Sequence, residues 1–422
     1  MTHPSTRILV IGAGYAGMLF TMRLAGKVAR LPVQITLVND ADTFTERPRL
    51  HQYATNLTFP VRSIPRMLRR TKVQFLQGFV TGLDPIERTV TVEEHQHTRQ
   101  LEYDYLVYAL GSATARTTVP GVAQYAYTLA PRGPLSAEAL REALPSVASS
   151  GGQVVVVGGG ATGIETAAEV ASAYPHITVR LITRGSLASS WNVHIASYIR
   201  RTLQRLGVEI IDQVGVTEVR PQSVVLDQGS ELPCDVCIWT GGFVAPTLAQ
   251  EAGVAVNALH QVIVDPFLRS ISHPEIYAIG DAASPREDPG VPMRMAAVTA
   301  VILGAHGADC LCAVLSGKTP KPLSFAYLGQ GIALGRHNAM GFNNYPDDTP
   351  VPPYFSGRVG YEIRELFVRY LAVAPRLERR WPGLFVWPGK GRYRAAQRGQ
   401  HAKERDSSLS EHQAEESTIV VK

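Results

Sequence analysis

The sequence contains little cysteine, with only Cys234, Cys237, Cys310 and Cys312 among its 422 residues. Its first residues lack the basic stretch followed by an apolar core that is typical of a secretory signal. Few cysteines and no such pattern are characteristic of proteins in a reducing compartment. We therefore expect a cytoplasmic protein that is not exported.

A strong charge of one sign is also missing, because 41 Lys and Arg residues stand against 36 Asp and Glu residues and the net charge is +5. Part of this small surplus lies near the C-terminus and not along a basic stripe, so we predict no nucleic-acid partner, and we predict no metal site. The single long apolar window, Met295 to Leu315, is interrupted by His306 and Asp309. Its many alanines and glycines favour a buried helix over a membrane span.

The most informative feature present is a pair of glycine-rich turns, Gly12-Ala13-Gly14-Tyr15-Ala16-Gly17 and Gly158-Gly159-Gly160-Ala161-Thr162-Gly163. Each turn follows a predicted strand, at 7–11 and 153–157, and precedes a predicted helix, at about 15–30 and about 163–174. The first glycine of such a turn permits a tight bend, the second lets backbone N–H groups approach a pyrophosphate, and the third lets helix and strand pack closely. The anion then lies at a helix N-terminus. Two such turns predict two dinucleotides.

The order of the segments predicts an α/β protein with two Rossmann-like dinucleotide-binding domains, the second inserted into the first. The first domain comprises residues 1–115 and 245–335, because the chain returns to it through Glu275–Ala282, and the second comprises residues 116–244. A C-terminal extension covers residues 336–395, with a Pro-rich loop at 346–353 and an amphipathic stretch at 358–371. The polar residues 396–422 are predicted to be disordered.

Five motifs in this order resemble the FAD- and NAD(P)-dependent pyridine nucleotide oxidoreductases over residues 5–335. They are the two glycine turns, the second followed by Ile164-Glu165, together with Ala109-Leu110-Gly111, Thr240-Gly241-Gly242 and Ile279-Gly280-Asp281. The resemblance implies that the first turn holds FAD, the second holds NAD(P)H, and Asp281 binds the ribityl chain or pyrophosphate region of the flavin. The implied cofactor-binding residues are Gly12, Gly14, Gly17, Gly111, Gly158, Gly160, Gly163, Gly242 and Asp281.

The positions of the cysteines narrow the resemblance. Disulfide reductases pass electrons through sulfur after the first βαβ unit, but residues 40–75 contain no cysteine. Cys234 and Cys237 fall on a strand of the second domain, and Cys310 and Cys312 are two apart on a helix and point away from each other. Electrons must therefore pass directly from the flavin to an external acceptor, as in the type II NADH dehydrogenases, the single-subunit NAD(P)H:quinone oxidoreductases, which this chain resembles.

The chain departs from that family where its quinone-lining helix carries glutamines, because Arg294-Met295-Ala296-Ala297-Val298-Thr299-Ala300 has none. Gln330 either supplies the missing amide near the ring or is an ordinary turn residue. Glu165 is either an acidic residue placed near a helix N-terminus because the helix dipole favours it there or, as the resemblance implies, a catalytic residue that approaches the nicotinamide and flavin rings. Glu165 and Gln330 are therefore the candidate catalytic residues.

Further cofactor contacts are predicted at the ends of the second strands of the two units. Asn39 or Asp40 is expected to bind the adenosine ribose of FAD, the alternative being that both are turn formers. Arg47, Arg49 and His51 either face the flavin or form a loop of surface cations. Thr183-Arg184 carries no acid, which favours NADPH over NADH, unless Arg184 is simply solvated.

The segment 358–387 combines apolar residues at helical spacing with several arginines, which fits either a core helix or a membrane-surface or dimer element. We therefore expect a small-molecule, quinone-type acceptor, reached at the inner face of the cytoplasmic membrane. The alternatives are a reductase of a soluble substrate or small redox protein, as the rubredoxin and ferredoxin reductases are, and a binding or signalling flavoprotein with slow turnover.

Overall fold

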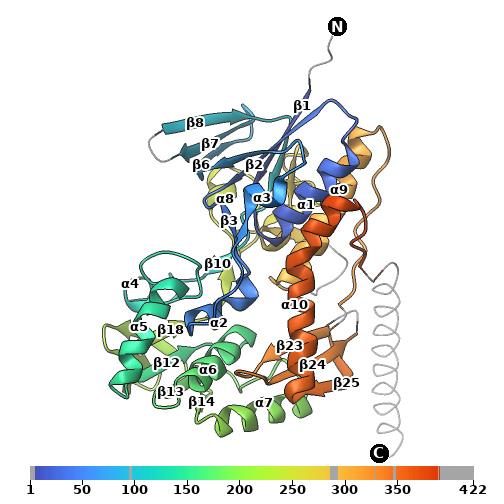
Figure 1. The fold of residues 1–422 in the computed structure, drawn as a ribbon. Coiled ribbons are helices and arrows are strands. Elements are labelled where there is room, and N and C mark those ends of the chain that lie inside the picture. The colour runs from blue at the N-terminus through green and yellow to red at the C-terminus, as the bar shows by residue number, and fades with distance from the viewer. Residues whose placement is uncertain are drawn as a thin grey trace, which may run out of the picture.

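The structure is a computed structural model that describes residues 5–94, 97–285, 293–327, 329–345, 348–387 and 389. The tail predicted to be disordered, 396–422, lies outside these residues. Two five-stranded parallel sheets occupy opposite halves of the molecule (Figure 1). This arrangement confirms the predicted α/β class with two Rossmann-like units.

The first sheet is built around the first glycine turn. Its strands, in the order β21-β9-β1-β2-β5, are Ile276–Ala278, Tyr105–Tyr108, Thr6–Ile11, Val33–Asn39 and Gln74–Gln77. The edge strand β21 comes more than 160 residues after β9 in the chain, so the chain leaves this sheet and later returns to it. Helix α1 (Tyr15–Lys27) and helix α9 (Ala297–Leu315) pack together beside the sheet.

The second sheet repeats this plan around the second glycine turn. Its strands, in the order β11-β18-β12-β13-β14, are Ala126–Tyr127, Val236–Trp239, Gln153–Val157, Thr178–Thr183 and Glu209–Asp212. Its helices are α5 (Ala137–Ser149), α6 (Ala161–Ala173) and α7 (Val193–Arg205). The runs of Val and Ile in both sheets are buried on both faces, as parallel strands require.

Short elements connect and extend the two sheets. The hairpin strands around residues 79–102 are β6 (Phe79–Asp84), β7 (Thr89–Glu94) and β8 (His97–Glu102), and the antiparallel strands of the second half are β15 (Val216–Arg220), β16 (Ser223–Leu226) and β17 (Glu231–Pro233). The remaining short pieces are β3 (Thr43–Phe44), α2 (Leu50–Ala54), β4 (Arg62–Ser63), α3 (Ile64–Leu68), α4 (Val122–Tyr125), α8 (Leu248–Glu251), β20 (Val262–Val264) and β22 (Ala283–Pro285). Where the chain passes between the halves, β10 (Ala113–Thr114) pairs with β19 (Phe243–Val244).

Helix α9 contains the apolar window noted in the sequence. It is the one helix among the described residues that is long and apolar enough to cross a membrane, and 67% of that window is buried inside the fold. Its two polar interruptions have partners, because Asp309 pairs with Arg23 and Lys27, and His306 lies 3.2 Å from the Pro266 carbonyl oxygen. The prediction of a buried helix at this position agrees with this packing.

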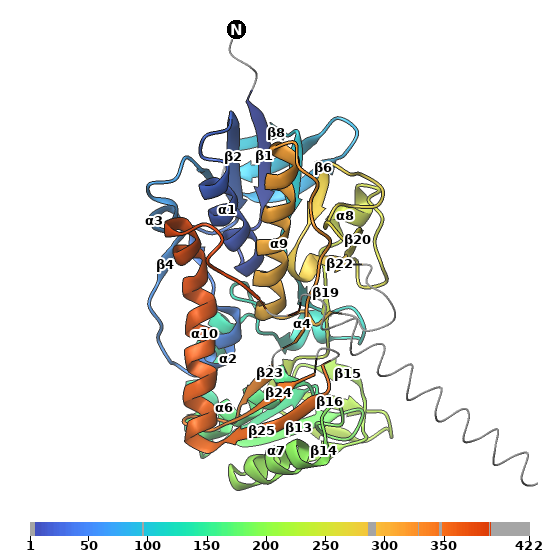
Figure 2. The same ribbon diagram turned by 90° about the vertical axis from the view of Figure 1, so that its right-hand side faces the viewer.

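The C-terminal segment joins the two halves. Strands β23 (Gly329–Ala333), β24 (Ala339–Asn344) and β25 (Pro350–Ser356) pack beside α6, and α10 (Gly357–Arg380) then runs along the molecule to α1 (Figure 2). The Pro-rich loop prediction for 346–353 is therefore wrong over its last residues. β25 is an edge strand, where a missing N–H donor is tolerated.

Candidate functional site

A cavity of about 1210 Å³ lies between the two halves and is lined by both glycine turns. Most of the predicted cofactor-binding residues, and both catalytic candidates, line this cavity. They are Gly12, Gly14, Asn39, Asp40, Arg47, Gly111, Gly158, Gly160, Glu165, Gly242, Asp281 and Gln330. Two ligands bound to the two turns would therefore meet in one space.

The first turn is closed by tight backbone packing and open at its centre. A Cβ atom at Gly12, whose φ is +98°, would lie 2.3 Å from the Ala109 carbonyl oxygen, and one at Gly17 would lie 1.9 Å from the Gly12 carbonyl oxygen. Gly14 differs, because a Cβ atom there would meet no described atom within 4 Å. Gly14 thus borders free space in the cavity, and Gly17 lies behind it.

The second turn has the same geometry at the equivalent positions. A Cβ atom at Gly158 would lie 2.4 Å from Thr240 Oγ1, and one at Gly163 would lie 1.8 Å from the Gly158 carbonyl oxygen. Gly160 again faces open space. Two turns with the same close contacts and the same open position indicate two sites for the same kind of group.

Both helices that follow the turns begin without a side-chain cap. The N-cap residues are Gly14 for α1 and Gly160 for α6, and neither can provide a capping oxygen. The first N–H groups of each helix therefore need another acceptor, and each N-terminus carries a partial positive charge. A pyrophosphate fits this requirement at both places.

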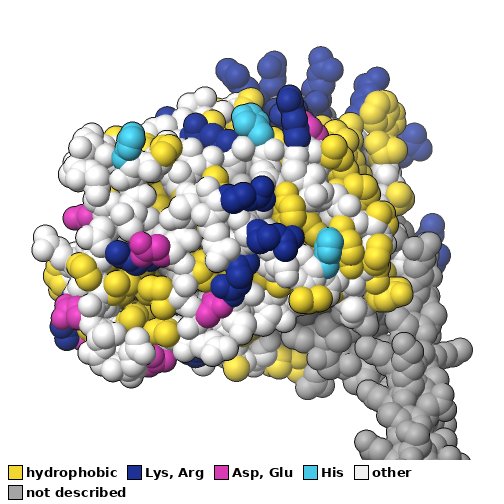
Figure 3. Space-filling model, turned by 90° about the horizontal axis from the view of Figure 1, so that it is seen from below, with side chains coloured by type: hydrophobic (Ala, Val, Ile, Leu, Met, Phe, Trp, Pro, Cys, Tyr) yellow, Lys and Arg dark blue, Asp and Glu magenta, His cyan; other side chains and the backbone are white. Residues whose placement is uncertain are grey.

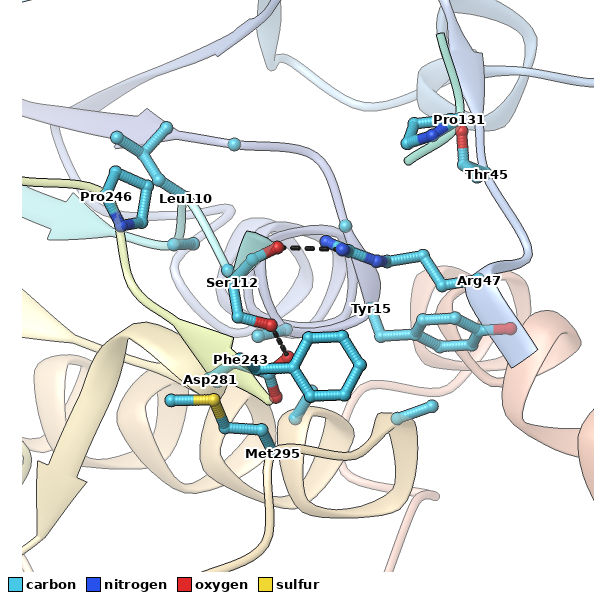
Figure 4. A pocket seen from close by; sticks show the side chains of 18 of the residues that line it. Tyr15, Thr45, Arg47, Leu110, Ser112, Pro131, Phe243, Pro246, Asp281 and Met295 are labelled. Carbon is cyan, nitrogen blue, oxygen red and sulfur yellow. Dashed lines mark hydrogen bonds between the residues drawn. The ribbon is translucent and has the colours of Figure 1, made fainter. Parts of the chain in front are cut away.

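Three residues that line the cavity, Arg47, Ser112 and Asp281, are joined by hydrogen bonds (Figure 4). Arg47 donates to the Ser112 carbonyl oxygen at 2.7 Å, and the Ser112 hydroxyl donates to Asp281 Oδ2 at 2.7 Å. Asp281 Oδ1 is buried without a hydrogen-bond partner in the described structure. Burial raises the pKa of the Asp281 carboxyl, and the Ser112 hydroxyl, Arg47 and the nearby Ala296 amide act against this shift. A buried carboxylate oxygen with no donor fits a polyol such as the ribityl chain.

The two candidates at the end of β2 have different roles. Asn39 Oδ1 accepts a hydrogen bond from the Ala13 amide at 2.8 Å, and its Nδ2 donates to the Ala41 carbonyl oxygen at 2.8 Å. Its amide is therefore used to fix the glycine turn. Asp40 is exposed and lines the cavity, so it is the better candidate for binding a ribose diol.

Glu165 lies in the second turn of α6, since that helix begins at Ala161 and not near residue 163 as predicted. Its Oε1 atom accepts hydrogen bonds from the Ala333 amide at 2.9 Å and from Arg364 Nη2 at 2.9 Å. The helix dipole alone therefore does not explain this glutamate. Gln330 lies on β23 and not in a turn, and its Oε1 atom lies 3.3 Å from Trp191 Nε1.

Arg49 and His51 do not line the cavity, so their predicted contact with the flavin is not supported by its described lining. Arg49 is buried and pairs with Glu46 and Glu365. His51 is also buried, and its Nε2 atom has no partner in the described structure. Burial lowers the pKa of His51 to about 4, with opposing contributions from Glu165 and Glu365 and reinforcing ones from Arg364 and Arg49.

Sequence reasoning missed Ser112 and Arg364. Ser112 directly follows Gly111 at the end of a predicted strand, which was the available signal. Arg364 was interpreted as one of several cations on an amphipathic stretch, but it is buried beside Glu165. Arg184 lies exposed at the end of β13 and is not part of the cavity lining.

All four cysteines are described, and none lines the cavity. Burial raises the pKa of Cys234 to about 11 and the pKa of Cys310 to about 12, and it also raises the pKa of Cys237. These thiols are therefore protonated at neutral pH and poor nucleophiles. Within the described residues, no group of three or more His, Cys, Asp and Glu side chains could hold a metal ion.

Two dinucleotide sites opening on one cavity define an oxidoreductase that works with two nucleotide cofactors. The sequence profile of the pyridine nucleotide-disulphide oxidoreductases matches residues 6–301, and the chain belongs to this family. It is 30% identical over 306 residues to an NADH dehydrogenase-like protein of Mycobacterium tuberculosis, a match that covers 67% of this chain and 74% of the relative.

Other relatives match a larger share of the chain. The chain is 27% identical over 358 residues to demethylphylloquinone reductase NdbB of Synechocystis, covering 81% of this chain and 87% of the relative. It is 24% identical over 386 residues to a type II NADH:quinone oxidoreductase of Haemophilus influenzae, covering 79% and 86%. These names confirm the resemblance to type II NADH dehydrogenases that the motifs indicated.

The fold is similar to that of solved structures. NDH2 from Plasmodium falciparum in complex with NADH superposes with a TM-score of 0.75 at 18% identity, covering 90% of this chain and 99% of that one. The sulfide:quinone oxidoreductase of Aquifex aeolicus superposes with a TM-score of 0.70 at 19% identity, covering 90% and 93%. Both matches extend into the C-terminal segment of this chain.

Proposed function

We propose that this protein is an FAD-dependent NAD(P)H oxidoreductase that passes electrons to a quinone-type acceptor. The observation that carries the proposal is the pair of equivalent, uncapped glycine turns opening on one cavity. The first turn, with Asp281 and Ser112, would hold FAD, and the second turn would hold NAD(P)H. The corresponding domains are residues 1–115 with 245–335 and residues 116–244.

The residues of the chain bind and orient the two cofactors. Amides at the N-termini of α1 and α6 would hold the pyrophosphates, Asp40 would hold the adenosine ribose of FAD, and Asp281 would accept from the ribityl hydroxyls. Glu165 and Gln330 line the same cavity and would approach the reactive rings of the two bound cofactors. When bound, FAD supplies hydride acceptance and electron release, while the protein supplies position and electrostatics.

The proposed acceptor follows from the cysteines. None of them borders the cavity, so a dithiol relay has no residue to carry it. The relatives include enzymes named as reductases of quinones. The cavity wall also contains apolar side chains, among them Phe243 and Met295, which suit a planar apolar molecule (Figure 4).

The test is anaerobic rapid mixing of the FAD-loaded protein with NADPH or NADH, followed by a panel of benzoquinones and naphthoquinones. We expect the flavin absorbance to bleach and then to return with a quinone faster than with oxygen. Gly160→Val is the matched control, because it should block the first step and leave bound FAD unchanged. Bleaching without reoxidation by any quinone would replace this proposal with a reductase of a soluble acceptor.

A membrane surface is the proposed place of that reaction. One side of α10 exposes Val359, Ile363, Leu366, Phe367 and Tyr370, and Leu366 is 71% exposed. We call this set the α10 face. The exposed charges on the same helix are four arginines and one glutamate, namely Arg358, Glu362, Arg369, Arg376 and Arg380.

Further cations lie beside the end of α10. Arg379 donates to the carbonyl oxygens of Met67 and Arg69, which brings the exposed Arg66, Arg69, Arg70 and Lys72 next to that end. Figure 3 shows hydrophobic side chains gathered at the upper right of the viewed face, with Lys and Arg side chains projecting beyond its upper edge. Apolar surface next to cations fits an anionic lipid surface, at about 1 kcal/mol for each cation close to the membrane.

Co-sedimentation with anionic vesicles tests this surface. We expect the full chain to bind such vesicles, to bind less at high salt, and to lose binding in Leu366→Glu. Val193→Glu on α7 is the matched control, because Val193 is 81% exposed on another helix. Vesicle binding that Leu366→Glu leaves unchanged would overturn the assignment. A dimer in solution with no vesicle binding would instead make the α10 face an interface between two copies.

A further inference from the structure

Six charged side chains form a continuous chain through the interior, from Arg62 on β4 to Glu165 at the cavity. Their signs alternate, in the order Arg62, Glu46, Arg49, Glu365, Arg364 and Glu165. Every side chain in this charge chain is at most 14% exposed. The positive and negative charges balance, so removal of any one member leaves a net charge in the interior, and removal of Arg364 leaves Glu165 without an ion-pair partner among the described residues.

The charge chain joins three parts of the molecule that are far apart in the sequence. Arg62, Glu46 and Arg49 come from the segment around β3 and β4, Glu365 and Arg364 come from α10, and Glu165 comes from α6 (Figures 1 and 2). Arg364 also donates to the Pro48 carbonyl oxygen at 3.2 Å. The C-terminal helix is therefore attached to both dinucleotide units at one point.

At the inner end, the contacts on Glu165 are all on one oxygen. Oε1 accepts from the Ala333 amide at 2.9 Å, from Arg364 Nη2 at 2.9 Å and from Arg364 Nε at 3.2 Å. No hydrogen bond to Oε2 is present among the described residues. Oε1 is thus fixed by three donors, and Oε2 is left available on a residue that lines the cavity.

Arg364 is itself held in one orientation. Its Nη1 atom donates to Glu365 Oε1 at 2.9 Å, and the other oxygen of Glu365 pairs with Arg49 Nη1 at 2.6 Å. A planar guanidinium with Nε and Nη2 on one carboxylate and Nη1 on another has little freedom to turn. A lysine at this position could supply the charge but not this fork.

We propose that Arg364 is a positioning residue for Glu165: through the charge chain, helix α10 fixes one carboxylate oxygen of Glu165 and presents the other to the cavity. The inference rests on the proposed function, in which Glu165 faces the reacting rings. Helix α10 would then have two roles, because Arg364 on its buried side positions Glu165 and its exposed side carries the α10 face. A shift of about 1 Å in a group at a reacting centre can lower a rate about a hundredfold.

The test compares Arg364→Met, Arg364→Lys, Glu165→Gln and the double variant Glu165→Gln/Arg364→Met in the FAD-loaded full chain. Arg201→Met is the control, because it removes the same charge from an exposed position of another helix, α7. We measure the rate of hydride transfer at saturating NADPH, the KM for NADPH and the thermal midpoint. Arg364→Met is expected to lower the rate at least tenfold with KM changed less than threefold, and Arg364→Lys to recover part of it.

The double variant separates positioning from an independent effect. If Arg364 acts through Glu165, the double variant should be no slower than Glu165→Gln alone, and its thermal midpoint should exceed that of Arg364→Met because no carboxylate of Glu165 is left unpaired. Losses that multiply in the double variant, or a wild-type rate in Arg364→Met, would overturn the inference. A wild-type rate in Glu165→Gln would instead contradict the proposed role of Glu165 itself.

Discussion

The open position at the centre of each glycine turn allows the two dinucleotide sites to be blocked separately. A Cβ atom at Gly14 or Gly160 meets no described atom within 4 Å, and both residues have φ values that valine can adopt, −72° and −78°. Gly14→Val and Gly160→Val should therefore leave the fold almost unchanged. The expected loss of folding stability is about 1 kcal/mol, since Val is a poorer N-cap residue than Gly.

The effect on ligand binding should be larger and specific to one site. The added side chain occupies the space next to the helix N-terminus where the pyrophosphate must lie. Overpacking of this kind costs about 1–3 kcal/mol, which corresponds to a dissociation constant about 5 to 150 times higher. Gly14→Val should lose FAD, whereas Gly160→Val should keep FAD and bind NAD(P)H more weakly.

The assays are the ratio of flavin to purified protein, calorimetric titration of FAD into flavin-free protein, and titration of NADP+ into the flavin-loaded protein. Gly17→Ala serves as the contrast, because its Cβ atom would lie 1.9 Å from the Gly12 carbonyl oxygen, so it should lower the thermal midpoint of the protein. Wild-type FAD affinity in Gly14→Val, or loss of FAD in Gly160→Val with wild-type NADP+ binding, would refute the assignment of the two turns.

Three further outcomes are expected. A variant with all four cysteines replaced by alanine should keep its turnover within about twofold, because none of these thiols lines the cavity; a large loss in a folded protein would contradict direct electron transfer from the flavin to the acceptor. Arg184→Ala should weaken NADPH binding by about 1–3 kcal/mol and leave NADH binding unchanged, and equal effects would show that Arg184 does not contact the 2′-phosphate. The pKa of His51 is lowered from 6.5 to about 4 by burial, so the unfolded chain takes up a proton that the folded one does not as the pH falls from 6.5 to 4. This difference adds about 3 kcal/mol to the free energy of unfolding above pH 6.5, and the gain is lost as the pH falls toward 4. In urea unfolding, the free energy of unfolding of the unmodified protein should therefore exceed that of His51→Gln by less at pH 4.5 than at pH 7.5.

The sequence was most informative where function depends on local backbone geometry. The glycine spacing at 12–17 and 158–163, each after an apolar strand, predicted both turns, because no other residue fits the contacts of Gly12 and Gly17. The choice of Asp281 came from the family resemblance, through the short motif Ile279-Gly280-Asp281. These signals lie within a few residues of one another, so they can be seen without knowing the fold.

The sequence was least informative about contacts between distant segments. Arg364 has the helical spacing of a surface cation, and only its partner Glu165, 199 positions away, shows that it is buried. Leu371 likewise belongs to the core and not to an exposed face. The prolines of β25 suggested a loop because the sequence does not show that this strand has a neighbour on one side only.

The pairing of β10 with β19 has a consequence for how the chain can be altered. Ala113 lies opposite Val244 and Thr114 opposite Phe243, so the place where the chain leaves the first sheet is next to the place where it comes back. Segments with adjacent ends can be exchanged or lengthened at little entropic cost to their host. Natural recombination could therefore have replaced residues 116–244, the proposed NAD(P)H domain, as one unit. A protein engineer could likewise graft in a domain of different coenzyme preference, provided the graft kept a carboxylate for Arg364.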